Sequence, residues 1–441
     1  MKRRIALILR AGRPHYRTSL TSLMRSLDRY HGHTDRLFRL YLAYDIGGTP
    51  SADEVSSLTI ASERAVARFE GVTYLTDRER RRLVDWVRQI VSVPEDALEL
   101  IFARTPYSFQ LNSALIAAAR DAMDAALLFD DDGYFWVPVD DIDGTRHWIH
   151  VDPVGAHLAA LDAGATVSVG EIAGARSPIP EALGRMLPAD VLCRLGVFFE
   201  GASEVLGYTS FLSSGYRPWQ DGSTLLTAVF PWKLEWVTPA NMAISLRSRF
   251  PVFFNPDGAR GEDAFFALAL REHDTIRRTA SAVFHDPFHL FPQIAFGSFP
   301  RSLRVRALTP EILLRFRSAL FGWVAYMPLF LGLTRSPQHD DGIARVYEAR
   351  RAMLRPIAAD LASHFADPVY DELIPWFDSY CARVDVDHAN WRQANHYWRN
   401  AILPAVLGHS VASGEGQNSG TSAAASVLAG REDDDHSVPG R

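Results

Sequence analysis

Lysine and cysteine are scarce in this chain of 441 residues. Lys2 and Lys233 are the only lysines, so arginine supplies nearly all of the positive charge. A guanidinium group binds phosphate oxygens in pairs, and this arginine bias therefore suits phosphate recognition. Cys193 and Cys381 are far apart and lack the spacing of a metal site. We expect reduced thiols in a cytoplasmic protein, with a single disulfide as the alternative.

The sequence shows no signal-peptide core and no clear membrane span. The apolar run at residues 5–9 is short and ends at Arg10, which is typical of a buried first strand. The longest uncharged segment, residues 318–334, is slightly short for a span and contains Pro328. We interpret it as a buried helix. Peripheral contact with a membrane surface or a lipid acceptor is the alternative.

Composition and charge narrow the class of protein. The chain is 47% hydrophobic and 22% charged, a globular balance that can bury a sizeable core. Its net charge of −6 gives no reason to expect nucleic acid as a partner. No internal repeat is present. Residues 410–441 are rich in Ser, Gly, Ala and Asp, cannot bury a core and are predicted to be a disordered tail.

Strand and helix patterns alternate along the first part of the chain. Strands are expected at 5–9, 37–43, 72–75 and 165–173, with an amphipathic helix at 18–30 and a helix rich in small residues at 109–123. This alternation predicts an α/β fold in which helices cover a mostly parallel sheet. From residue 301 the pattern becomes mainly helical. The acidic cluster at 140–144 ends in Asp-Gly and predicts a hairpin turn with structural carboxylates.

The most informative motif is a run of three aspartates, Asp130, Asp131 and Asp132, directly after the apolar residues 125–129. A solvated loop is the usual explanation of an acidic triplet. Here the preceding strand would deliver the carboxylates to the edge of a sheet, where α/β proteins bind ligands. Mg²⁺ and Mn²⁺ are held by such carboxylates and bridge them to a diphosphate. We therefore predict a divalent-metal site.

A second acidic pair, Glu262 and Asp263, follows Gly261 and precedes an apolar helix. Carboxylates at a helix start are often capping residues, because negative charge complements that end of the helix. The alternative is a catalytic pair. His285 and His289 lie further along the chain, and each is either a structural histidine or a metal ligand.

Together these motifs resemble the GT-A nucleotide-sugar glycosyltransferases, most closely the family-2-like group, over residues 1–295. The resemblance implies a GT-A nucleotide-sugar-binding and catalytic domain at 1–300. The helical region 301–409 would then lie on the acceptor side or at an oligomer contact. The same resemblance places the nucleotide sugar against Arg13, Asp45, Asn112, Asp130 and Asp131. It places Mn²⁺ or Mg²⁺ on Asp130 and Asp132, with His285 or His289 completing the metal shell.

The activity that this resemblance implies is metal-dependent sugar transfer. The donor would be a UDP- or GDP-sugar, and the acceptor a hydroxyl of a small molecule, glycan or lipid-linked compound. The cation stabilises the diphosphate leaving group as a Lewis acid. An inverting reaction also needs a base for the acceptor proton, a role that we assign to Asp263, with Glu262 orienting the acceptor. A retaining reaction stays open.

Three other functions fit parts of the sequence. A nucleotidyltransferase needs a glycine-rich phosphate loop with a lysine, whereas residues 10–13 supply one glycine and no lysine. A metal-dependent phosphoester hydrolase and a non-catalytic nucleotide-sugar-binding protein are the other two. The aromatic residues Trp391, Tyr397 and Trp398 suit either sugar stacking or a hydrophobic core.

Overall fold

The computed structural model describes residues 3–13, 15–45, 48–51, 55–58, 65, 69–103, 106–140, 146–174, 187–198, 224–226, 239–270, 274–301, 303, 309–334 and 340–416. The strands are β1 (Arg4–Ala11), β2 (Leu37–Tyr44), β3 (Phe69–Leu75), β4 (Ala125–Phe129), β5 (Gly133–Tyr134), β6 (Trp136–Asp140), β7 (Arg146–His150), β8 (Val167–Gly174), β9 (Thr224–Leu226), β10 (Asn241–Ser245) and β11 (Ile276–His285). The helices of the first 300 residues are α1 (Tyr16–His31), α3 (Asp77–Ile90), α4 (Glu95–Phe102), α5 (Pro106–Arg120), α6 (Pro153–Asp162), α8 (Ala189–Phe198), α11 (Glu262–Ala269) and the 3-10 helix η1 (Pro292–Phe296).

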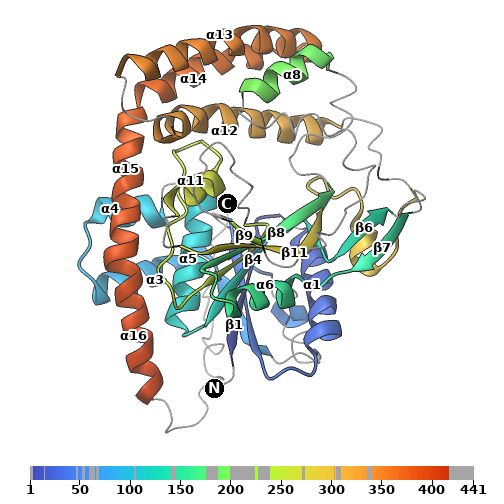
Figure 1. The fold of residues 1–441 in the computed structure, drawn as a ribbon, viewed down its shortest axis with the longest axis vertical. Helices are drawn as coiled ribbons and strands as arrows, with labels where there is room; N and C mark the ends of the chain where they lie inside the picture. Colours follow the sequence, from blue (N-terminus) through green and yellow to red (C-terminus); the bar gives the residue numbers. More distant parts are fainter. Residues whose placement is uncertain are drawn as a thin grey trace, which may run out of the picture.

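One large sheet forms the centre of the molecule (Figure 1). Its strands follow the order β3-β2-β1-β4-β10-β8-β11-β5, and β9 pairs with β11. The strands from β3 to β4 are parallel, as are β8 and β11. β10 is antiparallel to both of its neighbours, and β5 and β9 are antiparallel to β11. The sheet is therefore mixed, which corrects the expectation of a mostly parallel sheet.

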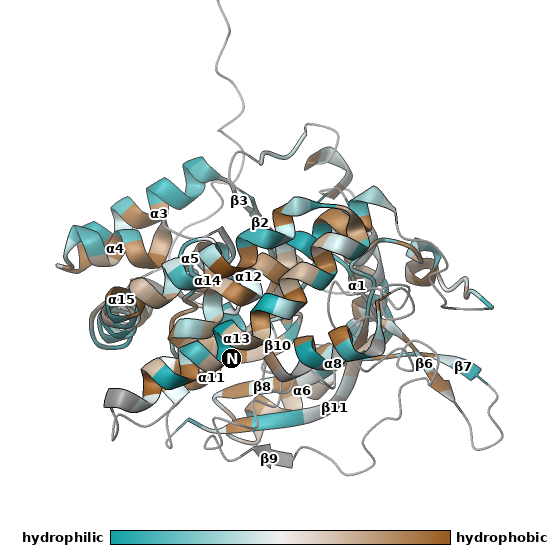
Figure 2. Cartoon of the chain, turned by 90° about the horizontal axis from the view of Figure 1, so that it is seen from above, coloured by the Kyte–Doolittle hydropathy of each residue, from teal (hydrophilic) through white to brown (hydrophobic). Residues whose placement is uncertain are grey.

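Both faces of the sheet are covered by helices. Along β1, Ile5, Leu7 and Leu9 belong to the core under α1 and α6, whereas Ala6 and Ile8 belong to the core under α4 and α5. Successive side chains of a strand point to opposite faces, and this is why an uninterrupted apolar run suits a strand buried on both sides. Figure 2 shows the outer helix α3 as mostly hydrophilic. β6 and β7 form the expected antiparallel hairpin, and its tip at 141–145 lies outside the described residues.

The C-terminal region is helical, as expected. It contains α12 (Pro310–Thr334), α13 (Asp340–Phe365), η2 (Pro368–Glu372), α14 (Leu373–Ala382), α15 (Val384–Tyr397), the π-helical turn η3 (Trp398–Ile402) and α16 (Leu403–Gly416). In Figure 1, α12 lies between the sheet and the α13–α14 pair, and α15 and α16 run down one side. These helices share one continuous hydrophobic core with the sheet.

Three sequence expectations can be checked in this region. α12 is the only described helix long and apolar enough to cross a membrane, and 61% of its most apolar stretch is buried within the protein, as a buried helix requires. Trp398 is fully buried against Phe102 and Phe250, which confirms a core role for this aromatic residue. The predicted tail boundary at Ser410 is wrong, because α16 continues to Gly416. Residues 417–441 lie outside the described residues.

Candidate functional site

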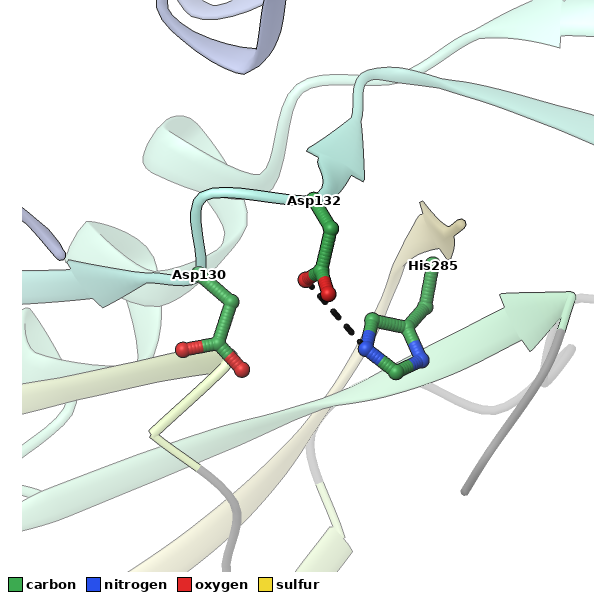
Figure 3. Close-up of side chains that lie close together, drawn as sticks. All are labelled: Asp130, Asp132 and His285. Atoms are coloured by element: carbon green, nitrogen blue, oxygen red, sulfur yellow. Dashed lines mark ion pairs between the residues drawn. The ribbon is translucent and has the colours of Figure 1, made fainter. Parts of the chain in front are cut away.

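The three aspartates follow β4 at the edge of the sheet, as their position after an apolar run predicted. Asp130 comes directly after Phe129, the last residue of β4. The chain then turns across the sheet, and Gly133 of β5 pairs with His285 at the end of β11. The backbone N–H of Asp286 also donates to the carbonyl oxygen of Asp132 at 2.8 Å. These contacts bring His285 next to the aspartates although it lies far along the chain (Figure 3).

Asp130, Asp132 and His285 form a group that can hold a metal ion. Each offers one ligand atom, and these atoms lie within 4.8 Å of one another. Nε2 of His285 is 3.2 Å from Oδ1 of Asp132. That oxygen is buried and faces the His285 nitrogen, without a well-aligned hydrogen bond among the described residues, so both atoms can share a ligand. Two carboxylates and an imidazole are a donor set that fits a divalent cation.

The structure separates the two candidate histidines. His289 stacks on the ring of His15 at 3.9 Å between centroids, and its Nδ1 lies 3.1 Å from the hydroxyl of Tyr134. It does not belong to the carboxylate group, so the expected metal role for His289 is corrected in favour of His285. His285 lies close to the aspartates because it is the last residue of β11, whereas His289 lies beyond the end of that strand.

Two arginines at the end of β1 pair with the aspartates. Arg10 donates to Asp130 and lies 3.4 Å from Oε1 of Glu262, so it connects the two acidic motifs. Arg13 contacts both Asp131 and Asp132, at 2.6 Å from Oδ2 of Asp132. Burial opposes the charge of both arginines, but the carboxylates outweigh it and hold the pKa of each guanidinium above its ordinary value.

The aspartates differ in their protonation behaviour. Burial opposes ionisation of Asp132, but His285 and Arg13 outweigh it and hold the pKa of Asp132 well below its usual range. Burial raises the pKa of Asp131 to about 6, although Arg13 opposes this shift. Asp132 is therefore the carboxylate best prepared to serve as a charged metal ligand.

Of the residues predicted to contact the nucleotide, Asp45 lies at the site and Asn112 does not. Asp45 follows β2 and lies against Gly12, where an added Cβ would overlap with its carboxylate. Gln110 donates to the Asp45 side chain. Asp45 thus lies at the same edge of the sheet as Arg13, where ligands of α/β proteins bind.

Asn112 is not at this edge, and its expected contact with a nucleotide is corrected. The side chain is fully buried. Its amide donates to the carbonyl oxygens of Ile101 and Phe253 at 3.0 and 2.9 Å, and its oxygen accepts from the N–H of Phe253 at 3.0 Å. The buried Asn112 amide makes its hydrogen bonds with backbone groups, and these bonds hold α4 and α5 to the 250–254 segment.

The second acidic motif begins α11. Gly261 is the N-cap residue with φ of 101°, and an added Cβ would lie 3.1 Å from the ring of Tyr326 on α12. Glycine is required there for both reasons. Glu262 is buried beside Arg10, whereas Asp263 is partly buried and accepts from the N–H of Ala264 at 2.8 Å. Burial and the Glu262 carboxylate raise the pKa of Asp263 to about 7.

The sequence reasoning missed three site residues. Arg10 was interpreted as the end of an apolar run and as part of a weak phosphate-loop match, although parallel pairing of Leu9 with Phe129 places it beside Asp130. Tyr107 lies close to Arg10, whose Cζ is 5.6 Å from the centre of the Tyr107 ring. Arg315 comes from α12 and is electrostatically coupled to Arg13, Asp131 and Asp132. Pairing of strands could have revealed Arg10, but no sequence signal reveals the docking of α12.

Sequence comparison does not assign the chain to a family. No protein-family model matches it. No curated protein matches it either.

Proposed function

We propose that this protein is a metal-dependent glycosyltransferase with a GT-A type architecture. It transfers a sugar from a UDP- or GDP-sugar to a hydroxyl acceptor. The observation that carries the proposal is the group formed by Asp130, Asp132 and His285 at an edge of the sheet, flanked by Arg10 and Arg13. A cation held by two carboxylates next to arginine side chains is suited to a diphosphate.

Each group has a role in this proposal. Asp130, Asp132 and His285 would hold Mn²⁺ or Mg²⁺, which would supply Lewis-acid stabilisation of the departing diphosphate. Arg13 is paired with two aspartates, and its planar donors match phosphate oxygens equally well. Asp45 contacts the nucleoside from the end of β2. Asp131 orients Arg13 through a salt bridge.

Asp263 is the base that removes the acceptor proton in an inverting reaction. A raised pKa near 7 suits this task, because a base is most effective when its pKa is close to the working pH. Glu262, which is tied to Arg10, orients the acceptor.

The helical region supports the acceptor side of the site. The loop before α11 contacts α12 through the N–H of Arg260, which donates to the carbonyl oxygen of Gly322 at 3.0 Å. The hydroxyl of Tyr380 on α14 also donates to the carbonyl oxygen of Asp257. These contacts fix the position of Glu262 and Asp263 relative to the helices. A small-molecule, glycan or lipid-linked acceptor would enter between them.

A donor screen tests the proposal. Purified protein is incubated with UDP- and GDP-sugars, Mn²⁺ and candidate acceptors, and the released nucleoside diphosphate is measured. Binding of the matching nucleotide should require metal. In Asp132→Ala we expect metal-dependent binding to be lost while the melting transition is retained, because this change removes the ionised ligand. Asp35→Ala, on the surface between α1 and β2, is the control.

Other outcomes would replace the proposal. Metal-dependent nucleotide binding that survives in Asp132→Ala contradicts the site assignment. Phosphate release without sugar transfer indicates a phosphoester hydrolase, and nucleotide-sugar binding without turnover indicates a binding protein. The anomeric configuration of the product decides between an inverting and a retaining reaction.

A further inference from the structure

Two arginines beside the site have no carboxylate partner among the residues that the structure describes. Arg260 lies in the loop before α11, and Arg315 lies on α12. Within the described part of the chain, neither guanidinium makes a hydrogen bond or ion pair. Each instead lies near an aromatic ring. Cζ of Arg260 is 5.6 Å from the ring centre of Tyr107, and Cζ of Arg315 is 5.3 Å from that of Phe288.

The two guanidiniums belong to one cationic cluster. Arg10 and Arg260 lie against the same Tyr107 ring, each with Cζ 5.6 Å from its centre. Arg13 donates to the carbonyl oxygen of Pro287 at 3.3 Å, next to the Phe288 ring that Arg315 contacts. Arg260 and Arg13 both oppose the charge of Arg315. Burial, followed by the charge of Arg13, lowers the pKa of Arg315. Asp131 and Asp132 act in the opposite direction, but both are already paired with Arg13. Like charges gathered in a partly buried place repel one another, and a bound anion removes that repulsion.

The position of Arg260 is built into the fold. Its aliphatic chain lies against Gly322 of α12, where an added Cβ would be 2.6 Å from Cγ of Arg260. Its backbone N–H donates to the carbonyl oxygen of the same Gly322. Arg260 is thus fixed between α12 and the ring of Tyr107, which is 37% exposed. A guanidinium held in this way loses little freedom when it binds an anion.

We infer that Arg260 and Arg315 form a phosphate-binding subsite between the carboxylate group and the helical region. The inference rests on the proposed function for the source of the phosphate. That source is either a phosphorylated acceptor, held next to Asp263, or the diphosphate of the donor. Arg10 and Arg13 differ from this pair because carboxylates already neutralise them.

Calorimetric titration with inorganic phosphate tests the subsite without a nucleotide. The full chain is titrated in Mg²⁺ as wild type, Arg260→Gln, Arg315→Gln and Arg317→Gln. Arg317 is the matched control, because it lies on the same helix and pairs with Asp367 at 3.3 Å. We expect each of the first two changes to weaken phosphate binding about tenfold or more, as loss of a charge-assisted hydrogen bond does. The control should bind as the wild type does.

A second titration in saturating UDP or GDP identifies the source. Phosphate binding that persists assigns the subsite to the acceptor, and binding that disappears assigns it to the donor diphosphate. A wild-type chain that does not bind phosphate, or binding that is equal in all four proteins, overturns the inference. Failure of nucleotide binding alone refutes the proposed function and leaves the phosphate result in place, so the two failures are distinguishable.

Discussion

At the scale of single residues, Asp263 carries the most mechanistic weight. The base that we propose must be unprotonated, and a pKa of about 7 for Asp263 means that activity should fall as the pH decreases below 7. Asp263→Asn should lower turnover by roughly 10²–10⁴ with normal melting and normal donor binding. Steady-state rates across pH and a thermal melt provide the measurement.

A matched control exists for the capping role of Asp263. Asp96 lies in the first turn of α4, and its Oδ1 accepts from the N–H of Ala97 at 2.9 Å, which is the same local contact. Asp96→Asn should leave turnover unchanged. If Asp263→Asn behaves in the same way, the residue is structural and the reaction has another base or none.

His157 should make stability depend on pH. It is fully buried between β8 and β10, with Nδ1 at 2.8 Å from the Ser168 hydroxyl and Nε2 at 2.9 Å from Oδ1 of Asn241. The amide nitrogen of Asn241 already donates to the carbonyl oxygen of Glu171, so Oδ1 accepts from Nε2. The Ser168 hydroxyl can donate to Nδ1 of the neutral ring. Burial lowers its pKa from 6.5 to about 4. The folded state thus resists a proton that the unfolded chain takes up.

Because the pKa of His157 is lower in the folded than in the unfolded state, acid lowers the free energy of unfolding. The stability from neutral His157 is complete above pH 6.5 and is lost progressively as the pH falls toward 4. The total is on the order of 3 kcal/mol. Denaturant unfolding of wild type and His157→Gln at several pH values measures it. The two curves should converge as the pH decreases, and parallel curves would contradict the assignment.

At the scale of elements, the join between α15 and α16 depends on a buried ion pair. Arg399 lies in η3 and donates to Asp274 at 2.8 Å and to the carbonyl oxygen of Ala269 at 3.0 Å. Both side chains are almost completely buried. Asp274→Ala leaves the guanidinium without its counter-charge, and we expect a loss of about 3–5 kcal/mol in the free energy of unfolding.

A surface pair provides the comparison. Arg351 and Glu348 lie one turn apart on α13, and Glu348 is largely exposed. Glu348→Ala should cost less than about 1 kcal/mol, because water screens such a pair. Equal losses in Asp274→Ala and Glu348→Ala would show that the buried pair is not required for the join.

At the scale of the whole molecule, truncation should locate the end of the folded unit. Residues 417–441 are rich in Ser, Gly, Ala and Asp and offer no apolar pattern. A chain that ends at Gly416 should melt as the full chain does. A chain that ends at Ile402 loses Leu403 and Val406, which are fully buried in the shared core, and should melt at a clearly lower temperature. Scanning calorimetry checks both, and equal melting of the two truncated chains would contradict a structural role for α16.

Much of this architecture is predictable from the sequence because apolar patterns report burial. Residues 5–9 and 125–129 are uninterrupted apolar runs, and both are strands buried on two faces. The position of Asp130 at a strand end follows directly. The sequence does not predict that β10 is antiparallel, or that His285 rather than His289 lies beside the aspartates. Both features depend on pairing between distant segments. Asn112 misled us because a polar residue in an apolar helix satisfies backbone groups as readily as it binds a ligand.

The wide spacing of the site residues along the chain has a consequence for biosynthesis. Arg10 and Asp130 are 120 positions apart, and Arg10 and Glu262 are 252 apart. The loop before α11 also contacts α12 and α14, which are translated later still. Domains tend to fold as the ribosome releases them, at roughly 5–20 residues per second. A nascent chain therefore exposes its aspartates well before His285 and Arg315 emerge, so the carboxylate group and its partners can assemble only late in synthesis.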